Sequence, residues 1–377
     1  MNLLKESPAA VLTSPGRVCN MLALLTIGLA LGQDTKVTPI HADECIVFFP
    51  TFGRPDPGAG TWTLDIHGWV FGWEVGPIGL VLLQTALGLA SADIDQASGT
   101  IFADRARWFL TDNERRKRAT VRLADKTFVT EESTPNGHFQ GHVQLPREEV
   151  ERVRAGSSSV PARVFFQAVL PAGRKDDFAG EIHLLDEEGV SVISDIDDTM
   201  KISEVRDHKK LLKNTFLLPF REVPGMAEVY QAWARAESAS FHYVSASPWQ
   251  LYMPLKEFMA QKGFPAGTFH LKYFRWKDRT FLSLFESPEH YKVATIEPLL
   301  DRFPKRRFLL VGDSGEEDPE AYGVLARKYG GRILGILIRD VTGEAPDAPR
   351  YREAFRELPE ATWRLFKDPA EVRDPFP

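Results

Sequence analysis

Two patterns of apolar and polar positions divide this chain. From about Cys45 to Leu185 the apolar residues recur at every second position. In TWTLDIHGWVF, for example, Trp62, Leu64 and Ile66 alternate with polar neighbours, which is the period of a half-buried strand. An Asn-Gly turn signal precedes a second alternating run in TPNGHFQGHVQL, and ARVFFQAVLPAGRKDDFAGEIHLL reads as two strands joined by a loop. Several short strands with turns between them predict a β-sandwich, with one interposed helix over residues 76–89.

After Gly189 the pattern changes to continuous apolar runs separated by segments of helical period. The runs are VSVI, FHYV, RFLLV and ILGILI, and the intervening segments include PGMAEVYQAWARA and HYKVATIEPLLDRF. Such alternation is typical of βαβ units around a buried parallel sheet. In that architecture ligands bind where the strands end, at their carboxyl edge.

Length and composition are those of a soluble globular protein of two domains. The chain has 377 residues, 43% of them hydrophobic and 26% charged, with a formal net charge of -6. This charge argues against a general nucleic-acid binder. The two cysteines, Cys19 and Cys45, exclude a disulfide framework and a cysteine zinc site.

The N-terminal residues 1–32 contain an uncharged apolar stretch, MLALLTIGLALG, after Arg17. It is shorter than the roughly 20 residues of a membrane-spanning helix and suits the apolar region of a secretory signal. We therefore expect an exported or membrane-peripheral protein. A buried or membrane-surface helix is the alternative, and the protein would be cytoplasmic if this segment is not a signal.

Two clusters of acidic residues follow predicted parallel strands. A lone acidic turn would explain the aspartates of SDIDDT, but a second acidic cluster follows another strand in GDSGEED. Because parallel strands end at the same edge of a sheet, the two clusters are expected to meet there and form a site. The candidate residues at this edge are Asp195, Asp197, Thr199, Ser245, Lys292, Asp313 and Asp318.

Several carboxylates in a small space need a cation among them. An EF-hand is excluded because DIDDTMKISEV lacks the glycine required at its sixth position. Mg²⁺ prefers oxygen ligands and is commonly bound together with a substrate phosphate, so it is the expected cofactor.

The order of these motifs resembles the haloacid dehalogenase superfamily, with its DxDxT after the first strand. More narrowly, DIDDT, SASPWQLY and LVGDSGEEDPEAYG resemble the phosphatidate phosphatase family typified by the fungal actin patch protein, over most of residues 45–340. Lipins, which share DxDxT, are more distant. The resemblance implies a Rossmann-type α/β parallel sheet with helices on both faces as the catalytic domain over residues 187–377. A smaller β-sandwich domain over residues 45–186 would precede it.

Residue roles follow from the same resemblance. Asp195 would be the nucleophile that forms an aspartyl phosphate, and Asp197 the general acid and then the base. We expect Asp195 to be ionised at neutral pH because an unperturbed Asp has a pKa of about 3.9. We expect neighbouring carboxylates to raise the pKa of Asp197, so that it can hold a proton. The Mg²⁺ ligands would be the Asp195 carboxylate, the Asp197 backbone carbonyl, Asp313 and, directly or through water, Asp318.

Phosphate binding is assigned by resemblance to Ser245 and Lys292, together with Thr199 of DxDxT. Each assignment has an alternative: Ser245 would merely cap the next helix, and Lys272 is the rival of Lys292. We expect Ser247 to cap that helix, and His242 and His290 to be structural.

Two further stretches bear on the substrate. HLKYFRWKDRTF (270–281) interleaves basic and aromatic residues, which suits a lipid surface or a single-stranded nucleic acid. The alternative is a strand and loop with buried rings and a solvated basic side. Residues 201–225 would form a small cap whose apolar NTFLLPF could line a path for acyl chains.

The predicted function is Mg²⁺-dependent hydrolysis of phosphatidate to diacylglycerol and phosphate, with a phospholipid at a membrane surface as partner and no nucleic acid. A soluble phosphomonoester or a nucleic-acid end is the first alternative substrate. The second alternative is a catalytically silent lipid-binding module.

Overall fold

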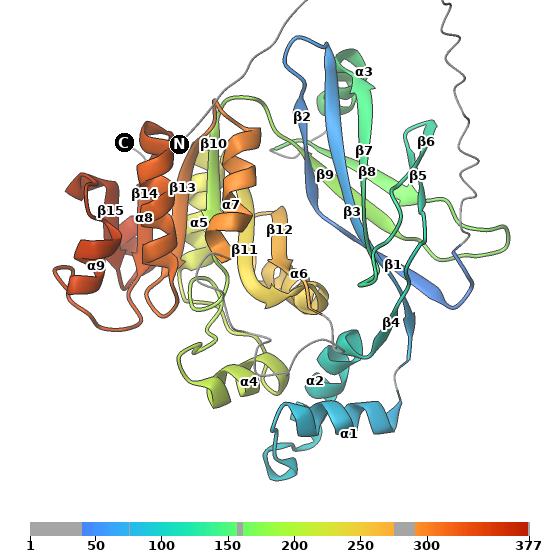
Figure 1. Ribbon diagram of the computed structural model, residues 1–377, viewed down its shortest axis with the longest axis horizontal. Helices are drawn as coiled ribbons and strands as arrows, with labels where there is room; N and C mark the ends of the chain where they lie inside the picture. Colours follow the sequence, from blue (N-terminus) through green and yellow to red (C-terminus); the bar gives the residue numbers. More distant parts are fainter. Residues whose placement is uncertain (1–39, 75, 157–160, 275–290, 376–377) are drawn as a thin grey trace, which may run out of the picture. The chain divides into compact units, whose positions relative to one another are not determined.

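The computed structural model describes residues 40–74, 76–156, 161–274 and 291–375 (Figure 1). The predicted signal over residues 1–32 lies outside these ranges and stays a prediction. None of the helices in the described ranges is long and apolar enough to cross a membrane.

The first half of the chain forms a mixed sheet of nine strands, in the order β1-β3-β2-β9-β8-β5-β6, with β4 and β7 both paired to β3. Only β2 and β9 run parallel; the other pairs are antiparallel. The predicted alternation is confirmed in β3, where Trp62, Leu64 and Ile66 are buried. The strands belong to one hydrogen-bonded sheet, and the predicted sandwich is not confirmed. They are β1 (Glu44–Phe49), β2 (Thr51–Pro55), β3 (Thr61–Trp73), β4 (Thr111–Asn113), β5 (Thr120–Leu123), β6 (Lys126–Val129), β7 (His138–Pro146), β8 (Arg163–Ala168) and β9 (Ala179–Leu184).

A helical insertion separates β3 from β4. The predicted helix is present as α1 (Pro77–Ala86), and a second helix, α2 (Gln96–Ala106), follows it without having been predicted. Asp95 begins α2 with a capping box, in which its side chain accepts a hydrogen bond from the Ser98 backbone while the Ser98 hydroxyl accepts one from the Asp95 backbone. A short 3₁₀ turn over Arg107–Phe109 leads on to β4, and α3 (Arg147–Ala155) follows β7.

The second half contains the predicted parallel sheet, and all five of its pairings are parallel. Its order is β12-β11-β10-β13-β14-β15, so β10, the strand that precedes the aspartates, lies in the middle. The strands are β10 (Val190–Ser194), β11 (Ser240–Pro248), β12 (Gly267–Lys272), β13 (Arg307–Asp313), β14 (Ile333–Arg339) and β15 (Trp363–Phe366).

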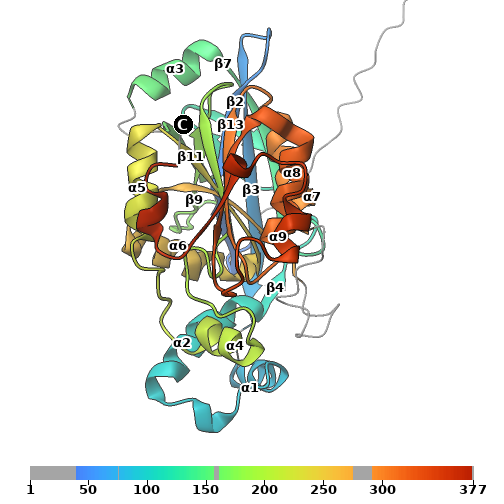
Figure 2. The ribbon, with the colours of Figure 1, turned by 90° about the vertical axis from the view of Figure 1, so that its left-hand side faces the viewer.

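Helices cover both faces of this sheet. Consecutive strand residues point to opposite sides, and in β10 both sides are apolar, so each face needs a layer of helices to bury it. Val192 belongs to one apolar cluster with residues of α5 and α6, and Ile193 belongs to another with residues of α7, α8 and α9. Figure 2 shows these two layers on either side of the strands. The helices are α4 (His208–Phe216), α5 (Met226–Ala236), α6 (Tyr252–Lys262), α7 (Tyr291–Arg302), α8 (Asp318–Tyr329) and α9 (Pro349–Ala354).

The two sheets share apolar packing, since the cluster on the α5–α6 face also contains Phe49 and Trp69 of the mixed sheet. Phe49 packs against Trp249 and Tyr252 at ring-centroid distances of 4.2 and 4.9 Å. This packing holds the segment that follows β11, and with it one side of the predicted site.

Candidate active site

The candidate residues come from three adjacent strand ends of the parallel sheet. Asp195 directly follows β10, and its backbone N–H donates to the carbonyl of Val311 in β13 at 2.8 Å. Asp313 is the last residue of β13, and Ser245 lies near the end of β11. The parallel register therefore brings residues more than 100 positions apart in the chain to one edge of the sheet, as the sequence predicts.

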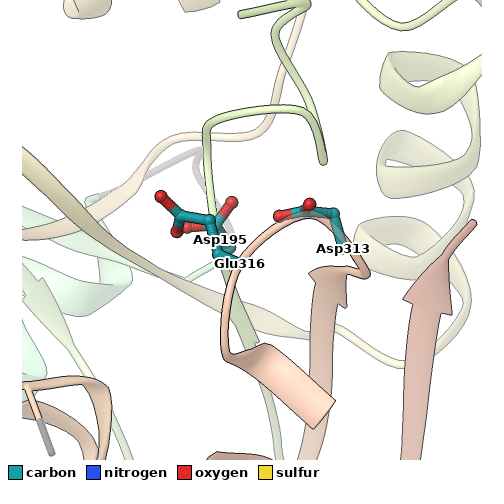
Figure 3. Close-up of side chains that lie close together, drawn as sticks. All are labelled: Asp195, Asp313 and Glu316. Carbon is teal, nitrogen blue, oxygen red and sulfur yellow. The ribbon is translucent and has the colours of Figure 1, made fainter. Parts of the chain in front are cut away.

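Three carboxylates form a compact group at this edge. Asp195, Asp313 and Glu316 each place one oxygen within 4.8 Å of the others (Figure 3). Asp195 and Asp313 are fully buried, and the Glu316 side chain is 15% exposed. Burial, together with the neighbouring carboxylates, raises the pKa of both Asp195 and Asp313, although Lys292 opposes the shift. The expectation that Asp195 keeps an ordinary pKa is therefore wrong for the chain without a cation.

This group fits a hard divalent cation. Oδ2 of Asp195 and Oδ2 of Asp313 are buried and have no hydrogen-bond partner in the described part of the chain, while Oδ1 of Asp195 faces the Lys292 ammonium group. Buried polar atoms without partners are rare in folded proteins and call for an ion, a water or a ligand. Three carboxylates are the donor set that Mg²⁺ prefers.

Glu316 was not among the predicted ligands, whereas Asp318 was. In the structure Asp318 Oδ2 accepts a hydrogen bond from the Asp313 backbone at 3.0 Å, and its Oδ1 contacts the Lys292 ammonium group. Asp318 also lies against Gly312, where a side chain would clash with its carboxylate. Asp318 thus supports the group rather than joining it. The signal for Glu316 was present in GDSGEED, but spacing alone does not say which of its acids faces the site.

Lys292 is the cation of this cluster. Its Nζ lies 2.9 Å from both Asp195 Oδ1 and Glu316 Oε2, and the side chain is buried. Burial opposes its charge, but the carboxylates outweigh burial and raise the pKa of Lys292. The structure thus brings Lys292 into the site from α7, while its rival Lys272 ends β12, two strands away from β10.

Asp197 lies in a separate set of hydrogen bonds. Its Oδ1 is 2.7 Å from both Lys201 Nζ and the Ser203 hydroxyl, and its Oδ2 accepts from Ser245 Oγ at 2.9 Å and Ser247 Oγ at 2.8 Å. Burial favours the protonated acid, but Lys201 and the hydroxyl donors outweigh burial and lower the pKa of Asp197. The expected rise in this pKa is therefore wrong, because the neighbours that matter are donors and not carboxylates.

The remaining predicted residues have clear surroundings. Ser247 is not a helix cap, since it lies within β11 and its hydroxyl donates to Asp197. Ser245 bonds to Asp197 and also accepts from the Ser247 backbone at 2.9 Å. Thr199 is fully buried, and its hydroxyl has no hydrogen-bond partner in the described part of the chain. His242 is structural as expected, since its ring contacts the hydroxyls of Thr268 and Ser191.

Asp198 organises the loop that carries these residues. Its carboxylate accepts three backbone hydrogen bonds, from Ser203, Glu204 and Val205, at 2.8–2.9 Å. Its own backbone has φ of 53°, a left-handed conformation that Asp tolerates better than most residues. The loop therefore turns back on itself and places Lys201 and Ser203 beside Asp197, which sequence spacing did not reveal.

Other predictions fall partly or wholly outside the described residues. His290 lies there, as do residues 275–281 of the basic and aromatic stretch. In the predicted cap, Phe216 and Leu217 of NTFLLPF are buried in the apolar cluster that includes Phe102 of α2. Most of that segment is therefore core, although Phe220 lines a cavity.

This cavity, of about 470 Å³, lies beside the Asp197 hydrogen bonds. The ring of Phe220 is 5.0 Å from Lys201 Nζ and 3.7 Å from the Arg105 guanidinium, measured to the ring centroid. The wall of the cavity is about equally polar and apolar. Its lining residues include Ile101, Trp108, Pro219, Phe220, Met253, Pro254 and Phe258, with Arg105, Arg107 and Glu257 among the polar ones.

The site thus combines a buried Asp after the central strand, a second acidic loop after the adjacent strand and a buried Lys. Comparison with known proteins gives a family match. Residues 190–340 match the family model described as the phosphatidate phosphatase APP1 catalytic domain.

Two curated relatives match about the same region. Phosphatidate phosphatase APP1 of Saccharomyces cerevisiae is 34% identical over 168 residues, which are 44% of this chain and 28% of that protein. An uncharacterized protein of Schizosaccharomyces pombe is 30% identical over 187 residues, 47% of this chain and 30% of that protein. The chain thus spans less than a third of the length of these relatives.

Among solved structures, a Photobacterium 2,6-sialyltransferase matches with a TM-score of 0.22 and 9% identity. The match covers 60% of this chain and 37% of that one, and it is too distant to bear on fold or function.

Proposed function

We propose that this chain hydrolyses phosphatidate to diacylglycerol and phosphate, with Mg²⁺ as cofactor and a haloacid dehalogenase-like catalytic domain. The observation that carries the proposal is the group of Asp195, Asp313 and Glu316 with Lys292 in contact, in a segment that matches the phosphatidate phosphatase family model. These residues would hold the cation, which would offset the charge of the carboxylates and of the incoming phosphate.

In the first half of the reaction an oxygen of Asp195 attacks phosphorus and the bond to the glycerol oxygen breaks. Lys292 stabilises negative charge on the transferring group, and the unpartnered Thr199 hydroxyl is free to donate to it. The leaving oxygen takes a proton from the hydrogen-bonded pair of Asp197 and Lys201, whose charged atoms lie 2.7 Å apart.

In the second half water attacks the aspartyl phosphate, phosphate departs and the Asp195 carboxylate is restored. The proton released by water returns to the Asp197–Lys201 pair. The lowered pKa of Asp197 keeps it ionised before this step, which is the form that a general base requires.

A lipid substrate is favoured over a soluble phosphomonoester by the cavity next to Phe220. The leaving group departs on the Asp197 side, and on that side the chain offers apolar walls from Trp108, Met253 and Phe258. The apolar part of this wall suits acyl chains, and its Arg105 and Arg107 suit an anionic lipid.

The deciding experiment measures phosphate release from phosphatidate in mixed micelles, with and without Mg²⁺. Asp195→Asn keeps the size of the side chain and removes the nucleophilic charge, so we expect activity to fall at least about a thousandfold. Asp347→Asn, the same change at an exposed position, is the matched control and should leave activity unchanged. Equal activity in Asp195→Asn and wild type would refute the mechanism.

The substrate class is tested with Met253→Trp, which fills the cavity without touching the carboxylates. We expect the KM for long-chain phosphatidate to rise about tenfold while the kcat for a water-soluble ester stays the same. Val324→Trp on the outer face of α8 serves as control. If the wild type releases phosphate only from the soluble ester, the mechanism stands and the lipid substrate does not. Vesicle binding without turnover of either substrate would favour the silent lipid-binding module.

A further inference from the structure

Helix α1 carries apolar side chains both on its packed side and on a side that faces solvent, and its polar residues are Gln84 and Thr85. Its sequence, PIGLVLLQTA, contains no charged residue. The inner side is packed, with Leu83 fully buried and Leu80 against the core. The outer row, Ile78, Val81 and Leu82, is 76%, 61% and 59% exposed. A row of large apolar side chains on a helix is normally buried, so this outer row lacks a partner within the described part of the chain.

The surroundings of this row have the character of a membrane interface. Trp73, the last residue of β3, is 41% exposed, and the Arg107 guanidinium lies 5.2 Å from its ring centroid. Indole rings and arginine side chains prefer the depth of lipid headgroups, where the cation meets phosphate.

Helix α1 is connected to the active-site loop through side-chain contacts. It packs with α2, and Arg105 of α2 donates to the carbonyls of Thr215 at 2.6 Å and Leu218 at 2.8 Å, at the end of α4. The segment before α4 carries Lys201 and Ser203, which hold Asp197. Figures 1 and 2 show α1, α2 and α4 together beyond the carboxyl edge of the parallel sheet.

We propose that the outer row of α1, Ile78, Val81 and Leu82, docks the protein on a phospholipid surface and so presents the active-site edge to lipid headgroups. This inference rests on the proposed function, because a lipid substrate lies in such a surface. With ten residues, α1 is too short to span a bilayer and would lie in the plane of the interface.

A second copy of the chain fits this row less well. A stable protein interface uses about 20–30 residues on each side, whereas the unpartnered row has three large side chains on one short helix. Insertion into lipid has no such size requirement, since each apolar side chain transferred from water contributes separately.

The test compares wild type with the double substitution Val81→Asp and Leu82→Asp in flotation with vesicles of phosphatidylcholine and 20% phosphatidate (roughly the proportion that gives an anionic surface). We expect the affinity for vesicles, and the hydrolysis of phosphatidate in them, to fall at least about tenfold. Hydrolysis of dispersed short-chain phosphatidate below its aggregation concentration should be unchanged. Val324→Asp, an exposed apolar residue on another helix, is the matched control and should bind vesicles like wild type.

Each result decides the proposal. Vesicle binding that is equal in wild type and the double variant would overturn it. So would light scattering that shows a wild-type dimer dissociated by the substitutions, because a second copy would then cover α1. If the double variant also loses hydrolysis of the dispersed lipid, the milder pair Val81→Ser and Leu82→Ser replaces it, and the same comparison decides. Hydrolysis of dispersed phosphatidate without vesicle binding would refute docking alone, whereas vesicle binding without any hydrolysis would refute the proposed function alone.

Discussion

Asp195 and Asp197 are two positions apart and both are buried, yet their surroundings are opposite. Asp195 faces Asp313 and Glu316, its Oδ1 contacts the Lys292 ammonium group, and its Oδ2 accepts no hydrogen bond in the described part of the chain. Asp197 accepts from three hydroxyls and one ammonium group. The pKa is accordingly raised for Asp195 and lowered for Asp197.

The difference shows how one loop provides two functions. A carboxylate without hydrogen-bond donors is costly for the ligand-free fold but available to a cation and to phosphorus. A carboxylate surrounded by donors is stable in its ionised form. It accepts a proton only from a group that becomes strongly acidic during the reaction, such as the attacking water. Environments that separate the pKa values of two acids are the usual way in which acid, base and nucleophile are assigned.

Among the substitutions that probe this difference, Lys292→Met should have the largest effect on stability. The substitution leaves Asp195, Glu316 and Asp318 without their buried cation, so we expect the free energy of unfolding to fall by about 3–5 kcal/mol in EDTA. Mg²⁺ should restore part of it. Urea unfolding measures both, with Lys262→Met of the surface pair with Glu222 as control, expected within about 1 kcal/mol of wild type. A Lys292→Met protein as stable as the control would contradict the role of this ion pair.

Asp195→Asn and Asp197→Asn should change the free energy of unfolding of the metal-free protein in opposite directions. Asp197→Asn leaves Lys201 without its carboxylate, and we expect a loss of about 1–3 kcal/mol. Asp195→Asn relieves repulsion with Asp313 and Glu316, and we expect a gain of about 0.5–2 kcal/mol together with the loss of activity. Urea unfolding in EDTA measures both variants, and shifts in the same direction would show that the two environments are not distinct.

The pH dependence of stability should separate the two aspartates as well. Asp195 and Asp313 have raised pKa values in the folded protein. Their contribution to the free energy of unfolding is therefore fully present below the ordinary pKa of 3.8 and is lost as pH rises through the raised values. Asp197 contributes above 3.8, and its contribution is lost as pH falls through its lowered pKa. Metal-free wild type should therefore lose stability from about pH 4 towards neutrality. Asp195→Asn should show a shallower slope, by up to about 1.4 kcal/mol per pH unit. Parallel pH profiles would argue against the raised pKa of Asp195.

The smallest effect is expected for Ser247→Ala, which removes one donor from Asp197. We expect a loss of about 0.5–1.5 kcal/mol, the contribution of a typical hydrogen bond, because three other donors still surround Asp197. In the Asp197→Asn background the same change should cost at least about 0.5 kcal/mol less, because the two residues are coupled. Additive losses in this double-mutant cycle would show that Ser247 acts elsewhere.

Much of the fold was predictable because it depends on local pattern. The alternation in β3 and the continuous apolar runs of β10, β11, β13 and β14 reflect whether one or both faces of a strand are buried. Helix α2 was missed because its apolar positions are few and its stability comes from packing against α1 and α4. The arrangement of the first nine strands in one mixed sheet also escaped prediction, since pairing depends on contacts between residues far apart in the chain.

The sequence by itself determined that carboxylates, a hydroxyl and a lysine would meet at the carboxyl edge of a parallel sheet, because strand direction and order of motifs suffice for that inference. Only the tertiary structure decided how each group is used. Glu316 and not Asp318 completes the carboxylate group, and Lys201 and Ser247 surround Asp197. The physical reason is that burial and hydrogen-bond partners, which set the pKa and the availability of each oxygen, depend on side-chain directions and loop turns such as the left-handed Asp198.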